Sequence, residues 1–192
     1  MLDALVTKFD RAAGLTSFRS RDERILRYFV EALAALKWVP EGGPAIDIGS
    51  GGGSPALPLA IARPMVEWVL VESNGRKSLF LEEAVRALGL DKVRVHRGRF
   101  EAMESPTRCD LVTCRAVKLE LKTQSMILSS LSTKGRFLWF GAEKRLESAC
   151  RDLSLNTTLR VEGPRPLLGT KRARSRGWLL IAEKRPGTQG NP

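Results

Sequence analysis

A chain of 192 residues can form one domain with a substantial core, and its 43% hydrophobic and 28% charged residues are typical of a globular protein. No apolar run reaches the roughly 20 residues of a membrane helix, and residues 1–11 mix charged with apolar side chains, unlike a signal peptide, so we expect a cytoplasmic protein without a membrane partner. The net charge of +11 favours a polyanionic partner, above all nucleic acid, although a basic protein without such a partner remains an alternative.

Strand and helix patterns alternate along the chain after a helical start. A capping box at residues 20–23 and apolar residues at helical spacing predict a helix over 21–37, which ends before the breaker-rich segment 40–44. Further helices are expected from Pro55 to about residue 63, over 74–88 and over 119–131. Apolar runs predict seven strands, over 45–48, 66–72, 93–96, 110–114, 136–140, 158–161 and 178–182.

This alternation predicts an α/β fold with a mostly parallel seven-stranded sheet and helices on both faces. Only a loop separates the last two strands, which predicts an antiparallel hairpin at one edge of the sheet. Residues 1–40 are expected to form a helical segment packed on the core, and residues 41–184 the main domain. The polar, breaker-rich tail 185–192 is expected to be disordered.

The most informative segment is residues 45–54, A-I-D-I-G-S-G-G-G-S, where an apolar strand runs into a glycine-rich turn. Glycine permits positive φ and close approach of a ligand, and doubly wound folds bind adenosine cofactors at such a turn. A dinucleotide fold requires G-x-G-x-x-G, but Ser54 occupies the sixth position. The segment instead fits the D-x-G-x-G-x-G turn of S-adenosylmethionine (SAM) methyltransferases. The expected cofactor-binding residues are Asp47, which would face the methionine ammonium or a bridging water, and Gly49, Gly51 and Gly53.

A second acid, Glu72, ends the second predicted strand, 19 residues after Gly53. A carboxylate at about this spacing can accept hydrogen bonds from both ribose hydroxyls and so fix the adenosine. The alternative is that Glu72 only solvates the end of a strand. The glycine turn before it favours ribose binding.

Two stretches, D-I-G-S-G-G-G-S-P-A-L-P-L-A-I from Asp47 and E-S-N-G-R-K-S-L-F-L from Glu72, closely resemble the RsmG family, also called glucose-inhibited division protein B. The resemblance covers about residues 14–184 and includes shorter matches at 15–17, 99–101 and 114–116. It implies a Rossmann-like class I SAM-dependent methyltransferase that modifies guanine N7 in 16S ribosomal RNA. The expected partner is 16S rRNA or the 30S subunit, and the expected state is a monomer.

The resemblance also implies further site residues. The backbone around residues 99–101 would lie near the adenine, so Phe100 and Glu101 join the expected cofactor site. Ser73, next to Glu72, is included as well. Arg115 follows the fourth predicted strand, at the edge where doubly wound folds place ligands. We assign Arg115 to catalysis, to the cofactor and to RNA, through guanine O6 or a phosphate. The alternative is a surface arginine paired with a helix carboxylate.

RNA contacts are further expected from basic side chains before the first strand and in the loop before the last strand. Arg27 matches an arginine that precedes the first strand in the family. The loop over residues 163–177 contains no acidic residue and is a candidate phosphate clamp, with a solvated loop as the equal alternative. Its expected RNA-binding residues are Arg172, Arg174 and Arg176.

Guanine N7 carries a lone pair and no proton, so its methylation needs no general base, only alignment with the methyl group and exclusion of water. This suits a chain whose single histidine is His96, which also leaves almost no material for a metal site. The motif of exocyclic-amine methylation is missing, and none of the three cysteines follows a proline, as base C5 methylation requires. Methylation of another RNA base or a small molecule, and RNA binding without catalysis, remain the alternatives.

The chain departs from the family pattern at Gly14, Tyr28, Glu31 and residues 141–144. The family usually has asparagine, histidine and aspartate at the first three positions and Lys-Gly after the fifth strand. We expect these departures to leave SAM binding intact and to affect the RNA-facing side.

Overall fold

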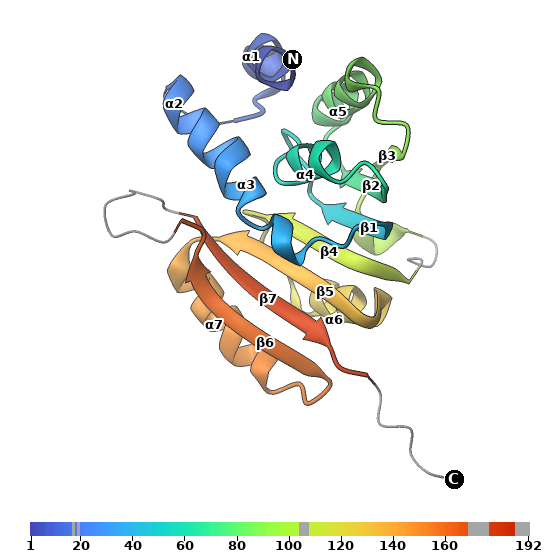
Figure 1. Ribbon diagram of the computed structural model, residues 1–192, viewed down its shortest axis with the longest axis vertical. Coiled ribbons are helices and arrows are strands. Elements are labelled where there is room, and N and C mark those ends of the chain that lie inside the picture. The colour runs from blue at the N-terminus through green and yellow to red at the C-terminus, as the bar shows by residue number, and fades with distance from the viewer. Residues whose placement is uncertain (17, 19, 104–107, 169–176, 187–192) are drawn as a thin grey trace.

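The computed structural model describes residues 1–16, 18, 20–103, 108–168 and 177–186. Seven strands form one sheet in the order β3-β2-β1-β4-β5-β7-β6, and helices lie against both of its faces (Figure 1). Apolar runs bounded by breakers form these strands, as predicted. The strands are β1 (Gly43–Ile48), β2 (Val66–Glu72), β3 (Val93–Arg97), β4 (Cys109–Arg115), β5 (Leu131–Gly141), β6 (Leu159–Pro166) and β7 (Trp178–Lys184).

The antiparallel edge is confirmed, with the last strand in an inner position. Strands β1 to β5 pair in parallel, whereas β7 runs antiparallel to both β5 and β6. The chain therefore places β6 at the edge and returns β7 between β6 and β5. This arrangement is the Rossmann-like fold that the sequence predicted.

The helices agree with the prediction in place, with two differences. The expected helix over 21–37 contains a π-helical turn, η1, and ends at Leu33. Helix α7 was not predicted, although its buried residues Leu146, Ala149 and Leu153 lie at helical spacing. No helix in the described part of the chain combines the length and apolarity needed to cross a bilayer. The helical elements are α1 (Leu2–Ala13), α2 (Arg21–Arg24), η1 (Ile25–Val30), α3 (Glu31–Leu33), η2 (Leu36–Trp38), α4 (Ala56–Ala62), α5 (Gly75–Leu88), η3 (Phe100–Ala102), α6 (Leu121–Ser130) and α7 (Glu143–Ser154).

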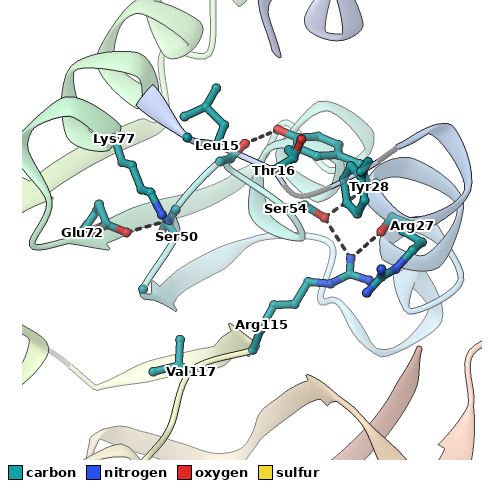
Figure 2. A pocket seen from close by; sticks show the side chains of 16 residues that line it. Leu15, Thr16, Arg27, Tyr28, Ser50, Ser54, Glu72, Lys77, Arg115 and Val117 are labelled. Atoms are coloured by element: carbon teal, nitrogen blue, oxygen red, sulfur yellow. Dashed lines mark hydrogen bonds between the residues drawn. The ribbon is translucent and has the colours of Figure 1, made fainter. Parts of the chain in front are cut away.

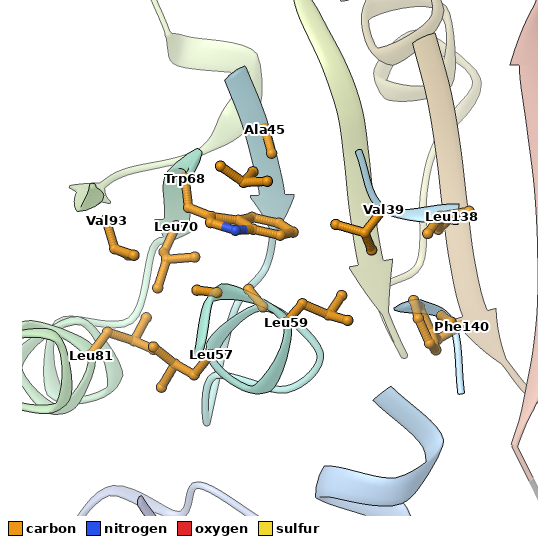
Figure 3. Close-up of a cluster of buried hydrophobic side chains, with 14 of the residues drawn as sticks. Val39, Ala45, Leu57, Leu59, Trp68, Leu70, Leu81, Val93, Leu138 and Phe140 are labelled. Atoms are coloured by element: carbon orange, nitrogen blue, oxygen red, sulfur yellow. The ribbon is translucent and has the colours of Figure 1, made fainter. Parts of the chain in front are cut away.

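The core has two halves because side chains alternate between the faces of each strand. In β2, Trp68 and Leu70 belong to one buried cluster and Val71 to the other. The first cluster packs against α1, α4 and α5. Figure 3 shows the Trp68 indole lying over α4, whose Leu57 points towards Leu81 of α5. The second packs against α6 and α7. Helices thus cover both faces of the sheet, and the carboxyl ends of its parallel strands lie between the two layers.

The first residue of the expected C-terminal tail contacts the start of β6. Arg185, assigned to the disordered tail, donates its backbone N–H to Thr158 O at 2.8 Å and its Nε–H to Leu159 O at 3.0 Å. Its side chain thereby extends the contact between β7 and β6. Residues 187–192 lie outside the described residues, so their expected disorder stays a prediction.

Candidate cofactor cleft

The glycine turn joins the end of β1 to α4 and depends on residues without a side chain. Gly49, Gly51 and Gly53 have φ values of +66°, +52° and +90°, a region that other residues rarely adopt. A Cβ at Gly49 would lie 2.6 Å from Val117 Cγ2, and one at Gly53 would lie 2.3 Å from Leu57 Cδ1. The sequence pattern therefore corresponds to a backbone path that only glycine can follow here.

Asp47 lies beneath this turn in the centre of the sheet. The parallel register places it beside Thr113 of β4, whose hydroxyl donates to Asp47 Oδ1 at 2.5 Å. Asp47 Oδ2 is buried and has no hydrogen-bond partner among the described residues. Burial raises the pKa of Asp47 from 3.8 to about 7, and the Thr113 hydrogen bond opposes this shift. One oxygen of this buried carboxyl is therefore left without a partner beneath the turn.

Replacing Asp47 with asparagine is expected to stabilise the protein without ligand at pH 8 and to change its stability little at pH 4. A raised pKa means that the folded chain retains a proton that the unfolded chain has released, so this carboxyl costs stability as pH rises from about 4 to 7. The gain at pH 8 should be on the order of 4 kcal/mol. Denaturant unfolding across this pH range measures it, with exposed Asp91→Asn as the control. A pH-independent difference between Asp47→Asn and wild type would contradict the expectation.

Glu72 ends β2 and serves two backbone groups of the cleft. Its Oε2 accepts from the Gly51 N–H at 2.8 Å, and its Oε1 accepts from the Asn74 N–H at 2.7 Å. The carboxylate therefore holds the glycine turn against the start of α5, a contact that the sequence did not indicate. Each oxygen still has a lone pair, so the same carboxylate can accept from ribose hydroxyls.

Two adjoining cavities run along the carboxyl ends of β1, β2 and β4. The larger, about 530 Å³, has the size of a small-molecule site and is lined by the glycine turn, Glu72 and Arg115 (Figure 2). The smaller, about 240 Å³, is lined by Ser73, Phe100 and Glu101. Gly49 and Val117 line both cavities, so we treat them as one cleft. The structure thus brings together most of the predicted cofactor residues, whereas Asp47 and Gly53 support the turn from below.

Glu101 lies at the smaller end of the cleft. The Thr123 hydroxyl at the start of α6 donates to Glu101 Oε1, and this hydrogen bond lowers the pKa of the carboxyl. Glu101 is therefore held as an anion beside the backbone of Phe100. This geometry places the carboxylate where it can contact a ligand in the smaller cavity.

Arg115 is the last residue of β4, and its guanidinium points across the larger cavity towards η1 and α3 (Figure 2). Nη1 donates to Arg27 O at 2.6 Å and to Ser54 Oγ at 3.1 Å, and Nη2 pairs with Glu31. Burial lowers the pKa of Arg115, and the neighbouring Glu31 carboxylate opposes this effect. Arg115 therefore does pair with a helix carboxylate, as the alternative interpretation expected. That interpretation placed the pair on the surface, whereas the structure buries it.

The predicted RNA-binding arginines divide between described and undescribed parts of the chain. Arg27 lines the larger cavity, and its Nη1 lies 3.3 Å from Glu23 Oε1. The other members of this set, Arg172, Arg174 and Arg176, lie outside the described residues. Only Arg27 and Arg115 can therefore be placed beside the cleft.

Sequence reasoning missed several residues that line the larger cavity. Tyr28 donates its phenol hydrogen to Gly52 O at 2.5 Å, and burial raises the pKa of this phenol, so it remains a donor. The expectation that the departure at Tyr28 concerns the RNA-facing side stays a prediction, and its phenol in addition contacts the glycine turn. Ser54 follows the glycines directly, and Leu15 and Lys77 lie in the stretches that match the family, so position could have drawn attention to all three. Tyr28 stood out only as a departure from the family pattern.

Comparison with solved structures supports the fold. The chain is similar to precorrin-6y C5,15-methyltransferase from Geobacter metallireducens, with a TM-score of 0.64 and 12% identity over 81% of this chain and 87% of that one. An rRNA methylase from Streptococcus thermophilus gives a TM-score of 0.62 and 11% identity, over 81% of this chain and 94% of that one. At such identities the likeness shows the fold alone.

Sequence comparison identifies the family. "Ribosomal RNA small subunit methyltransferase G" of Neisseria meningitidis serogroup C is 39% identical over 112 residues, 58% of this chain and 54% of that protein. The protein of the same name from Stenotrophomonas maltophilia is 42% identical over 114 residues, 59% of this chain and 53% of that one. The matched region thus spans about half the length of these curated relatives. Because the GidB family model, described as rRNA small subunit methyltransferase G, matches residues 2–162, the chain belongs to this family, as its sequence motifs predicted.

Proposed function

We propose that this protein transfers a methyl group from SAM to N7 of a guanine in 16S rRNA. The observation that carries the proposal is the pair of acids, Asp47 and Glu72, at the ends of adjacent parallel strands on either side of a glycine turn that opens into a cleft. Membership of the GidB family supports the acceptor. The net charge of +11 supports a nucleic-acid partner.

The residues of the cleft fit SAM. Glu72 would accept hydrogen bonds from the ribose hydroxyls, and Ser73, Phe100 and Glu101 would line the adenine end. The glycine turn lets the methionine moiety lie directly on the backbone. The unpartnered Oδ2 of Asp47 suits the methionine ammonium or a bridging water. When bound, the cofactor supplies an electrophilic methyl group on a sulfonium centre.

The chain itself has to orient the acceptor and exclude water. Guanine N7 attacks through its lone pair and releases no proton, so no side chain has to act as a base. Arg115 is a candidate contact for guanine O6 or a phosphate, through the guanidinium hydrogens that its contacts with Arg27, Ser54 and Glu31 leave available. Arg27 would approach the RNA from the same side. We further propose that the protein acts in the cytoplasm, as a monomer, on 16S rRNA or the 30S subunit.

A labelling experiment tests this proposal. The protein is incubated with methyl-labelled SAM and either deproteinised rRNA, naked 30S subunits or no RNA, and the labelled nucleotide is then mapped. We expect label on guanine N7 with at least one RNA substrate, and label that appears far more slowly with a Gly49→Ala variant. Label on another atom would favour a different acceptor, and SAM binding without transfer would favour an RNA-binding protein on the same fold.

A further inference from the structure

Tyr28 contacts the glycine turn at two residues, Gly52 and Ser54. Its phenol donates to Gly52 O at 2.5 Å, and its own carbonyl accepts from Ser54 Oγ at 2.8 Å (Figure 2). Tyr28 is separated from these residues by 24 and 26 positions in the chain. The three-residue segment 52–54 is therefore held at two points by one residue of another element.

The turn needs such support because four of its first five residues are glycine. Glycine loses more conformational freedom on folding than any other residue. Within the turn, Gly53 N donates to Ser50 O at 2.7 Å, and Glu72 fixes Gly51. The carbonyl of Gly52, by contrast, is held by the phenol of Tyr28. A cofactor that lies on this backbone needs the turn already in place.

Tyr28 is itself held rigidly enough to act as a support. Its side chain is 1% exposed, and its ring centroid lies 4.8 Å from that of Phe29. It belongs to the π-helical turn η1, where the carbonyls of Arg27 and Tyr28 accept from the side chains of Arg115 and Ser54. A π-helical turn inside an α-helix often marks a functional site. Helix, glycine turn and the end of β4 are thus joined by one chain of hydrogen bonds.

We propose that Tyr28 is a positioning residue, which preorganises the glycine turn for the cofactor and couples it to the helix that carries Arg27. The inference rests on the proposed function, because it concerns the same cleft. Loss of the phenol hydrogen bond leaves the turn more mobile before binding, so cofactor affinity falls. The chemical step is unaffected once the cofactor is bound, because the phenol bonds to the backbone and not to the reacting atoms.

The test replaces Tyr28 with phenylalanine, which keeps the buried ring and removes only the hydroxyl. Calorimetry with S-adenosylhomocysteine is expected to show about 5- to 10-fold weaker binding. The KM for SAM should rise by a similar factor, while kcat at saturating SAM stays near that of wild type. Ser54→Ala removes the second contact, the hydrogen bond to the Tyr28 carbonyl, with a small change in side-chain volume. It should also lower the affinity for S-adenosylhomocysteine.

The matched control is Ser130→Ala in α6. Its buried hydroxyl also donates to a backbone carbonyl, that of Ile127 at 2.8 Å, but α6 contacts the opposite half of the core. This variant should lose stability and keep wild-type cofactor affinity. Equal affinity of Tyr28→Phe and wild type would overturn the inference alone, as would a fall in kcat without a rise in KM. If the wild-type chain bound no S-adenosylhomocysteine, the proposed function would fall and the inference with it.

Discussion

Replacing Arg115 with methionine is expected to lower the free energy of unfolding by about 3–5 kcal/mol, the usual effect of removing one partner from a buried ion pair. Glu31 is fully buried and Arg115 is 16% exposed, so the carboxylate would lose this guanidinium in a medium that solvates charge poorly. Arg27 O and Ser54 Oγ would lose a donor as well. Denaturant unfolding measures the change, and an unfolding midpoint equal to that of wild type would contradict it.

A double variant separates the structural role of Arg115 from its role towards RNA. Arg115→Met with Glu31→Gln leaves neither charge buried, so it should recover at least half of the lost stability. If Arg115 contacts the acceptor, methylation stays low in this stabilised variant. Restored methylation would instead show that Arg115 acts only by holding the helix to the sheet, the alternative that the Glu31 contact favours.

The second large effect is expected from Gly49→Ala, which should reduce kcat/KM about 100-fold, the scale of loss that a displacement of about 1 Å produces. The new Cβ would lie 2.6 Å from Val117 Cγ2, and valine side chains have little rotational freedom to retreat. Gly49 and Val117 line both parts of the cleft. Any shift that relieves the contact therefore moves the surface on which the cofactor lies. Calorimetry with S-adenosylhomocysteine should show a parallel loss of affinity.

Gly89→Ala is the matched control for this variant. Gly89 ends α5 with a φ of +63°, close to the +66° of Gly49, but a Cβ there would meet nothing within 4 Å. Both variants bear the strain of a left-handed alanine, about 1–2 kcal/mol. Only Gly49→Ala adds the contact in the cleft. Comparable activity of the two variants would show that strain, not the shape of the cleft, determines the loss.

The strands and the glycine turn could be predicted because their signals are local. An apolar run such as residues 66–72 can bury both faces only inside a parallel sheet, and the glycines correspond to positive φ at Gly49, Gly51 and Gly53. Glu72 could be placed at the cleft from its position at a strand end and its spacing after the glycine turn. Helix α7 carried an equally local signal and was still overlooked, so its omission was an error of interpretation.

Three features of the site depend on the tertiary structure. Arg115 and Glu31 are 84 positions apart in the chain, and Tyr28 reaches Gly52 from another element. The burial that raises the pKa of Asp47 depends on the register of β1 against β4.

The sequence by itself thus determined the class of fold, the path of the turn and the two acids at its sides, because these follow from backbone preference and from the period of apolar residues. The tertiary structure alone decided that β7 lies between β5 and β6, and that the Tyr28 phenol contacts the glycine turn. The physical reason is that periodicity indicates which face of an element is buried, whereas the partner on that face is set by how distant elements pack together.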